Sequence, residues 1–182
     1  MRIFISGGVK NGKSFYAQRL AKAQQTESLY YIATMRPADT EDDERIARHR
    51  KDRDGWGFTT VEQHADIDQI LKRCCRGGSF LLDSATALLA NEMFPETGGV
   101  NENASEKIMS GLSRVLSRVE NIVIVSDYIY GDADKFGPLT EKYRESLAAV
   151  DRFLAARCDI VLEIVYSNVI VHKGGAKFAA IY

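Results

Sequence analysis

A phosphate-binding loop near the start of the sequence constrains the fold more than any other feature. Residues 1–6 (MRIFIS) form a short, largely apolar run, and residues 7–14 (GGVKNGKS) match G-x-x-x-x-G-K-[ST] at every required position. Such a loop joins a buried strand to a helix. Its glycines let backbone N–H groups approach phosphate oxygens, and the helix directs its positive end at the same point. The sequence therefore predicts a nucleoside triphosphate site.

The residue types in this loop predict separate roles in phosphate and metal binding. Lys13 is expected to bridge the β- and γ-phosphates, and the Ser14 hydroxyl is expected to bind Mg²⁺. Asp83 ends a short buried run, residues 79–83, which is the Walker-B arrangement for a carboxylate that contacts Mg²⁺ or a metal-bound water. Many buried strands end in Asp for turn reasons, so a turn residue is the alternative here. A glycine-rich turn that binds no ligand is the alternative, but the complete spacing and the Lys-Ser ending argue against it. The predicted nucleotide-binding residues of the loop are Gly7, Gly8, Val9, Lys10, Asn11, Gly12, Lys13 and Ser14.

Composition narrows the class of protein and its surroundings. A chain of 182 residues with 45% hydrophobic and 27% charged residues suits one globular domain over residues 1–182. The formal net charge of −1 gives no general attraction to nucleic acid or to anionic membranes. Three cysteines, two of them adjacent, fit neither a disulfide framework nor a zinc site, which favours a reducing, cytoplasmic setting. We expect no signal peptide and no membrane span, because polar residues interrupt the longest apolar stretch, 159–171.

Strand-like and helical patterns alternate along the chain. Strand patterns occupy residues 29–34, 56–62, 79–83 and 121–126, and helical patterns occupy about 15–25, 66–75, 84–94, 104–119 and 139–157. This alternation predicts an α/β fold of the P-loop NTPase, RecA-like type, with a mostly parallel central sheet flanked by helices. Two further strand patterns, 159–165 and 169–172, lie close enough to form a hairpin with an antiparallel strand at the C-terminal edge.

A highly charged block, residues 39–54 (DTEDDERIARHRKDRD), follows the second strand pattern. Its acidic start and basic end suit a helix dipole, and Ile46 and Ala47 are its only hydrophobic residues. A helix with so small an apolar face is either a solvated surface helix or part of a site. The pattern alone favours the solvated helix.

The residues of this block resemble those of a known family. Residues 45–50 (RIARHR), followed by Arg53, Trp56, Thr60 and Glu62, are similar to the stretch R-I-x-x-H-[RK]…R-P-x-x-W-x-T-x-E. That stretch belongs to the bifunctional adenosylcobinamide kinase / adenosylcobinamide-phosphate guanylyltransferases of cobalamin biosynthesis. The loop at 7–14, the Y-I-A-T segment at 31–34, and residues 82–84 with Asn91 also match the family. The resemblance covers about residues 1–94 and is weak beyond them.

The resemblance implies a mechanism for guanylyl transfer. His49 would attack the α-phosphorus of GTP, release pyrophosphate and carry GMP as a phosphoramidate, which adenosylcobinamide phosphate then accepts. The family also phosphorylates adenosylcobinamide with ATP or GTP and Mg²⁺, and forms homotrimers. The catalytic residues implied are His49 and Lys13. The further nucleotide-binding residues implied are Thr34, Met35, Arg36, Arg50, Lys51, Asp52, Arg53, Glu62 and Asp83. His64 and His172 lack this context and are expected to be structural or exposed.

Departures from the family pattern leave two alternatives open. The R-P dipeptide reads Arg53-Asp54, the family's N-E-V-G appears as residues 126–131 (SDYIYG), and its G-x-x-N-Q appears as residues 148–152 (AAVDR). One alternative is a small-molecule kinase that forms no covalent intermediate, with the charged block as a cationic lid. The other is a module that binds nucleotide without transferring it. The absence of an N-K-x-D guanine motif counts against an ordinary GTPase switch.

Overall fold

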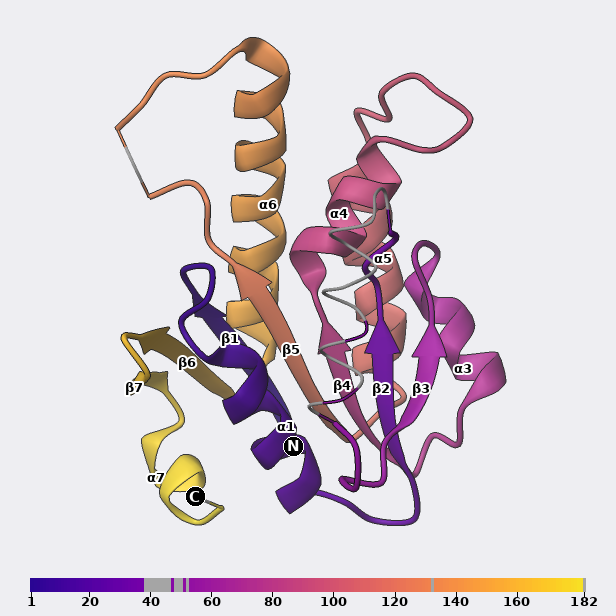
Figure 1. Ribbon diagram of the computed structural model, residues 1–182, viewed down its shortest axis with the longest axis vertical. Helices are drawn as coiled ribbons and strands as arrows, with labels where there is room; N and C mark the ends of the chain where they lie inside the picture. The colour runs from indigo at the N-terminus through magenta and orange to yellow at the C-terminus, as the bar shows by residue number, and fades with distance from the viewer. Residues whose placement is uncertain (38–46, 48–50, 52, 132, 182) are drawn as a thin grey trace.

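A seven-stranded sheet forms the centre of the computed structural model, which describes residues 1–37, 47, 51, 53–131 and 133–181 (Figure 1). The strand order is β3-β2-β4-β5-β1-β6-β7. Neighbouring strands run parallel except β7, which pairs antiparallel with β6 at one edge. The predicted α/β sheet is therefore confirmed. The strands are β1 Arg2–Gly7, β2 Leu29–Ala33, β3 Thr59–Glu62, β4 Ser79–Asp83, β5 Asn121–Asp127, β6 Ile160–Val165 and β7 Asn168–Lys173.

Helices cover both faces of the sheet because the central strands are apolar on both sides. Ile3 and Ile5 of β1 pack in one core cluster with helix α1, and Phe4 between them packs in the other with α4, α5 and α6. The short helices η1 and α3 join the second cluster, and α7 lies against the first. The helices are α1 Lys13–Ala23, η1 Ile67–Gln69, α3 Ile70–Arg73, α4 Ala85–Met93, α5 Ala104–Leu116, α6 Pro138–Arg157 and α7 Gly175–Ala179. No described helix is both long and apolar enough to cross a membrane.

Several expected boundaries differ from the structure, most of all those of the strand expected over 56–62 and the helix expected over 104–119. The strand pattern at 56–62 begins only at Thr59, because residues before it form turns in which Trp56 N–H donates to the Arg53 carbonyl at 3.1 Å. Gly55 and Gly57 adopt left-handed φ values of 77° and 81° there, which a strand does not allow. The helix expected over 104–119 ends at residue 116, and the short helix α7 has no counterpart among the predicted elements. The charged block 39–54 lies almost wholly outside the described residues.

The strand order brings the P-loop and two acidic strand ends together. β5 lies between β1 and β4, so Gly7 is in register with Asp127, and Asp83 with Val125. β2 follows on the other side of β4, with Ala33 beside Asp83. Ligands of open α/β sheets bind at the carboxyl ends of such strands. The loop at residues 7–14 therefore opens onto the same edge as both carboxylates.

Candidate active site

The P-loop has a backbone path that depends on its glycines. Gly12 is the residue that precedes α1, and its φ of 87° is in the left-handed region. A Cβ on Gly7 would lie 2.5 Å from the Ile164 carbonyl oxygen, so the loop fits closely against β6. No side chain caps the first turn of α1, and that turn holds no acidic residue. Its N–H groups and dipole therefore favour an anion.

Lys13 is folded back over the loop that it follows. Its side chain is only 5% exposed, and its Nζ donates to the Gly8 carbonyl oxygen at 2.6 Å. The same Nζ lies 2.6 Å from Asp127 Oδ1 at the end of β5. The ammonium therefore has a charged partner at the place where the loop N–H groups converge, and phosphate oxygens would compete with Asp127 for it.

Ser14 and Asp83 form the candidate magnesium site. The Ser14 hydroxyl donates to Asp83 Oδ2 at 3.1 Å, and the Tyr31 hydroxyl donates to the same oxygen at 2.8 Å. Hydroxyl and carboxylate oxygens suit Mg²⁺, which in nucleotide sites takes one or two protein ligands beside phosphate oxygens and water. The described part of the chain holds no cluster of three or more His, Cys, Asp or Glu side chains that could bind a metal without the nucleotide. The residues present therefore fit a magnesium ion that enters with the triphosphate.

Tyr31 links this carboxylate to the end of the charged block. The Arg53 guanidinium carbon lies 3.5 Å from the centre of the Tyr31 ring, and the Arg53 side chain is buried. Such stacking is a cation–π contact. Lys51 is exposed, whereas the predicted residues His49, Arg50 and Asp52 lie outside the described residues. Of this segment, Arg53 lies beside the Tyr31–Asp83 pair.

The segment after β2 is anchored by polar contacts. The buried Thr34 hydroxyl donates to the Ser84 carbonyl oxygen at 2.8 Å and accepts from the Ser84 N–H at 2.7 Å. The Asn91 amide donates to the carbonyl oxygens of Thr34 at 2.7 Å and His64 at 2.9 Å. The Thr34 side chain thus holds the strand end in position, and the partly buried Met35 continues from it.

Two other predicted nucleotide-binding residues belong to strand ends further from β1: Arg36 follows β2, and Glu62 ends β3. Arg36 Nε lies 3.2 Å from Glu96 Oε1 in an ion pair near the surface. Glu62 ends β3, the edge strand, so β2, β4 and β5 separate it from β1. The Glu62 side chain is exposed. The structure therefore brings together the loop, Asp83 and Arg53, with Glu62 at the far end of the same row of strand ends.

Sequence reasoning missed two residues of this site. The sequence places Asp127 only at the start of a divergent loop, yet it ends β5 and pairs with Lys13. Its N–H donates to the Thr86 hydroxyl at 2.8 Å, which holds the strand end against α4. Tyr31 is, by sequence, one of several aromatic residues in a buried strand. An acidic residue directly after the apolar run 121–126 was the signal for Asp127, as it was for Asp83.

Solved structures of two other proteins have a similar fold. The flagellar accessory protein FlaH of Methanocaldococcus jannaschii superposes with a TM-score of 0.50 and 16% identity, covering 94% of this chain and 77% of that one. A KaiC-like protein of Pyrococcus horikoshii gives a TM-score of 0.50 and 12% identity, covering 94% and 79%. At such identities the likeness concerns the fold alone.

Sequence comparisons identify the family. The bifunctional adenosylcobalamin biosynthesis protein CobP of Pseudomonas aeruginosa is 29% identical over 161 residues, 88% of this chain and 91% of its own length. The bifunctional adenosylcobalamin biosynthesis protein CobU of Escherichia coli is 24% identical over 177 residues, 91% and 96% of the two lengths. The family model for cobinamide kinase / cobinamide phosphate guanyltransferase matches residues 3–169, which include the P-loop and both carboxylates. This chain therefore belongs to the cobinamide kinase / cobinamide phosphate guanyltransferase family.

Proposed function

We propose that this chain phosphorylates adenosylcobinamide and then transfers GMP from GTP to adenosylcobinamide phosphate, acting as a homotrimer. The observation that carries the proposal is the P-loop, in which Lys13 and Ser14 contact the carboxylates Asp127 and Asp83 at neighbouring strand ends. The family model spans all of these residues. The named relatives are bifunctional proteins of adenosylcobalamin biosynthesis, which supports two activities in one chain.

Phosphoryl transfer would use groups that the P-loop already directs to one point. The N–H groups at the start of α1 bind the phosphates, and Lys13 exchanges Asp127 for phosphate oxygens as the charge develops. Ser14 and Asp83 would hold Mg²⁺, which when bound neutralises charge on the β- and γ-phosphates. Asp127, released from Lys13, is then available to accept the proton of the acceptor hydroxyl.

Guanylyl transfer would use His49 as the nucleophile. An imidazole nitrogen attacks the α-phosphorus of GTP, the bond to the β-phosphate oxygen breaks, and pyrophosphate leaves with that electron pair. A phosphate oxygen of adenosylcobinamide phosphate then attacks the same phosphorus, and the P–N bond breaks to return the neutral imidazole. The cations of the neighbouring segment, among them Lys51 and Arg53, would stabilise the charge in transit. This step rests on the sequence motif, because His49 lies outside the described residues.

The mass of the intact protein after incubation with GTP and Mg²⁺ tests the covalent step. A GMP-sized, acid-labile increment is expected in the wild type and absent in His49→Ala. His172→Ala is the matched histidine control: the increment forms from GTP without any acceptor, so His172, exposed on the C-terminal hairpin, should leave it unchanged. Chromatography of the corrinoid products with ATP or GTP tests the kinase step, and light scattering tests the trimer. If adenosylcobinamide becomes phosphorylated but no adduct forms, the chain is a plain kinase.

A further inference from the structure

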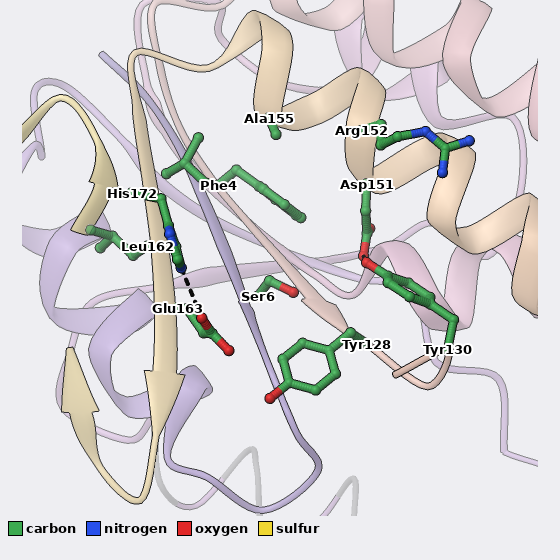
Figure 2. A pocket seen from close by; sticks show the side chains of 11 residues that line it. Phe4, Ser6, Tyr128, Tyr130, Asp151, Arg152, Ala155, Leu162, Glu163 and His172 are labelled. Carbon is green, nitrogen blue, oxygen red and sulfur yellow. Dashed lines mark hydrogen bonds and ion pairs between the residues drawn. The ribbon is translucent and has the colours of Figure 1, made fainter. Parts of the chain in front are cut away.

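A cavity of about 270 Å³ lies beside the P-loop, on the face of the sheet that α6 covers (Figure 2). Its walls come from β1, β6, β7, α6 and the loop that follows β5. Phe4 and Ala155 supply apolar wall, and Tyr128, Tyr130, Asp151 and Glu163 supply most of the polar groups. None of these six residues belongs to the nucleotide site predicted from the sequence.

The cavity and the phosphate site share two strand ends. Ser6, which lines the cavity, directly precedes the first P-loop glycine. The Tyr128 N–H donates to the Gly7 carbonyl oxygen at 3.3 Å, which ties the cavity wall to the loop. Tyr128 also follows Asp127, whose carboxylate lies 2.6 Å from Lys13 Nζ. A molecule in the cavity would therefore lie next to the phosphate-binding loop.

Asp151 is the residue that points to a ligand. Its side chain lies on α6, is only 4% exposed and lines the cavity. The Tyr130 hydroxyl donates to Asp151 Oδ2 at 2.7 Å, while Oδ1 has no hydrogen-bond partner among the residues that the structure describes. Burial raises the pKa of this carboxyl to about 6, against the opposing effect of the Tyr130 and Ser126 hydroxyls. Buried polar atoms are rarely left without a partner, because desolvation then goes uncompensated.

One pair of polar side chains in the cavity is already engaged. His172 Nε2 lies 2.8 Å from Glu163 Oε2, as Figure 2 shows by the dashed line. Asp151 lines the cavity, and its buried Oδ1 is an acceptor without a partner among the described groups, so it suits an O–H or N–H donor. Phe4 and Ala155 suit the carbon atoms next to such a donor. The volume suits an arm of a substrate rather than a large ring system.

We propose that this cavity is the acceptor subsite: it binds the hydroxyl-bearing arm of the alcohol that receives the phosphoryl group. Asp151 Oδ1 accepts a hydrogen bond from a donor on that arm, and Phe4 and Ala155 contact its carbons. The alcohol then approaches the P-loop past Ser6 and Tyr128. This inference rests on the proposed function, since it concerns the acceptor of the same reaction.

Steady-state kinetics of two cavity variants test this subsite. Asp151→Asn keeps the shape and the bond from Tyr130, but turns an amide donor toward the cavity. It should raise the acceptor KM by about 10- to 100-fold, the usual effect of losing a hydrogen bond to a charged group. Ala155→Leu fills part of the cavity and should also raise the acceptor KM. Ala156→Leu is its matched control, because Ala156 is exposed on the same helix. The KM for the nucleotide should stay unchanged in all three.

Equilibrium dialysis with cobinamide separates failure of this inference from failure of the proposed function. If the wild type phosphorylates cobinamide and Asp151→Asn leaves the acceptor KM unchanged, the subsite is overturned and the function stands. The subsite is also overturned if Ala155→Leu and Ala156→Leu act alike. Cobinamide binding that depends on Asp151, without phosphorylation, would support the subsite and refute the kinase. No binding of cobinamide to the wild type would overturn both.

Discussion

Replacing Asp151 by asparagine should stabilise the protein at alkaline pH more than at acidic pH. Burial raises the pKa of this carboxyl from 3.8 to about 6, with a smaller contribution from the charge of Asp127. In the unfolded chain the carboxyl loses its proton near pH 3.8, whereas in the folded chain it keeps the proton up to about pH 6. Folding stability is therefore lost as the pH rises through this window. Asparagine does not titrate and removes the loss.

The size of the effect follows from the two pKa values. At about 1.4 kcal/mol per pKa unit, the shift from 3.8 to about 6 amounts to about 3 kcal/mol above the window. At about pH 4.5 the loss of folding stability is only about 1 kcal/mol, because that pH is still close to the pKa of the carboxyl in the unfolded chain. The advantage of Asp151→Asn over the wild type should thus grow by about 2 kcal/mol between about pH 4.5 and pH 8. Any pH-independent effect of the amide cancels in this difference.

Urea unfolding of both proteins across this pH range measures the difference directly. The free energy of unfolding at each pH comes from the midpoint and slope of the transition. Parallel pH profiles for the two proteins would refute the reasoning, since they would mean that Asp151 has the same pKa folded and unfolded. A stabilised variant that binds the acceptor poorly would show that this carboxyl is kept for function at the expense of stability.

Three further substitutions test other contacts of the fold. Asp159→Asn should destabilise the protein near neutral pH and lose its effect in acid, because the Arg2 backbone N–H lowers the pKa of the Asp159 carboxyl. Urea titrations at several pH values measure the destabilisation, and a destabilisation that grows in acid would contradict this prediction. Thr34→Val should cost about 2–4 kcal/mol in urea unfolding, because it leaves the buried N–H and carbonyl of Ser84 without their partner; a cost near zero would contradict it. Gly174→Ala should lower the melting temperature, because Gly174 has a left-handed φ of 78° and the added Cβ would lie 2.3 Å from the Asp159 carbonyl oxygen. An unchanged melting temperature would exclude this strain.

Local patterns were enough to predict the strands, the longer described helices and the position of the P-loop in the sequence, but not the short helix α7. The runs at 3–5 and 122–125 are apolar at every position, which only strands buried on both faces require. The loop between the first strand and the first helix has a sequence motif whose residue types and spacing suit phosphate binding. The motif alone therefore predicts roles for Lys13 and Ser14. The edge hairpin followed from two strand patterns separated by a very short turn.

Strand order and the cavity depend on contacts that no local pattern records. Asp83 and Asp127 both end apolar runs, yet only the order β4-β5-β1 shows that the two carboxylates lie at neighbouring strand ends on the same side of the loop. Asp151 lies in a helix where an aspartate is normally solvated, yet it is buried and accepts a hydrogen bond from Tyr130 in the loop after β5. Its role as a cavity wall appears only when α6, β1 and β6 are packed together. The sequence therefore predicted residues of the proposed nucleotide half of the site, and it gave no signal for the proposed acceptor half.

The Lys13–Asp127 ion pair leads to a prediction about nucleotide affinity. Asp127 and the phosphates compete for one buried ammonium, whose Nζ lies 2.6 Å from Asp127 Oδ1. Asp127→Asn replaces a charged acceptor by a neutral one, which weakens the competing bond by about 1 kcal/mol. The variant should therefore bind Mg²⁺-GTP about fivefold more tightly in calorimetry, while phosphoryl transfer falls because the proposed proton acceptor is gone. Lys13→Met is the control that should lose binding. Weaker binding by Asp127→Asn would refute the competition and indicate that Asp127 supports the bound nucleotide instead.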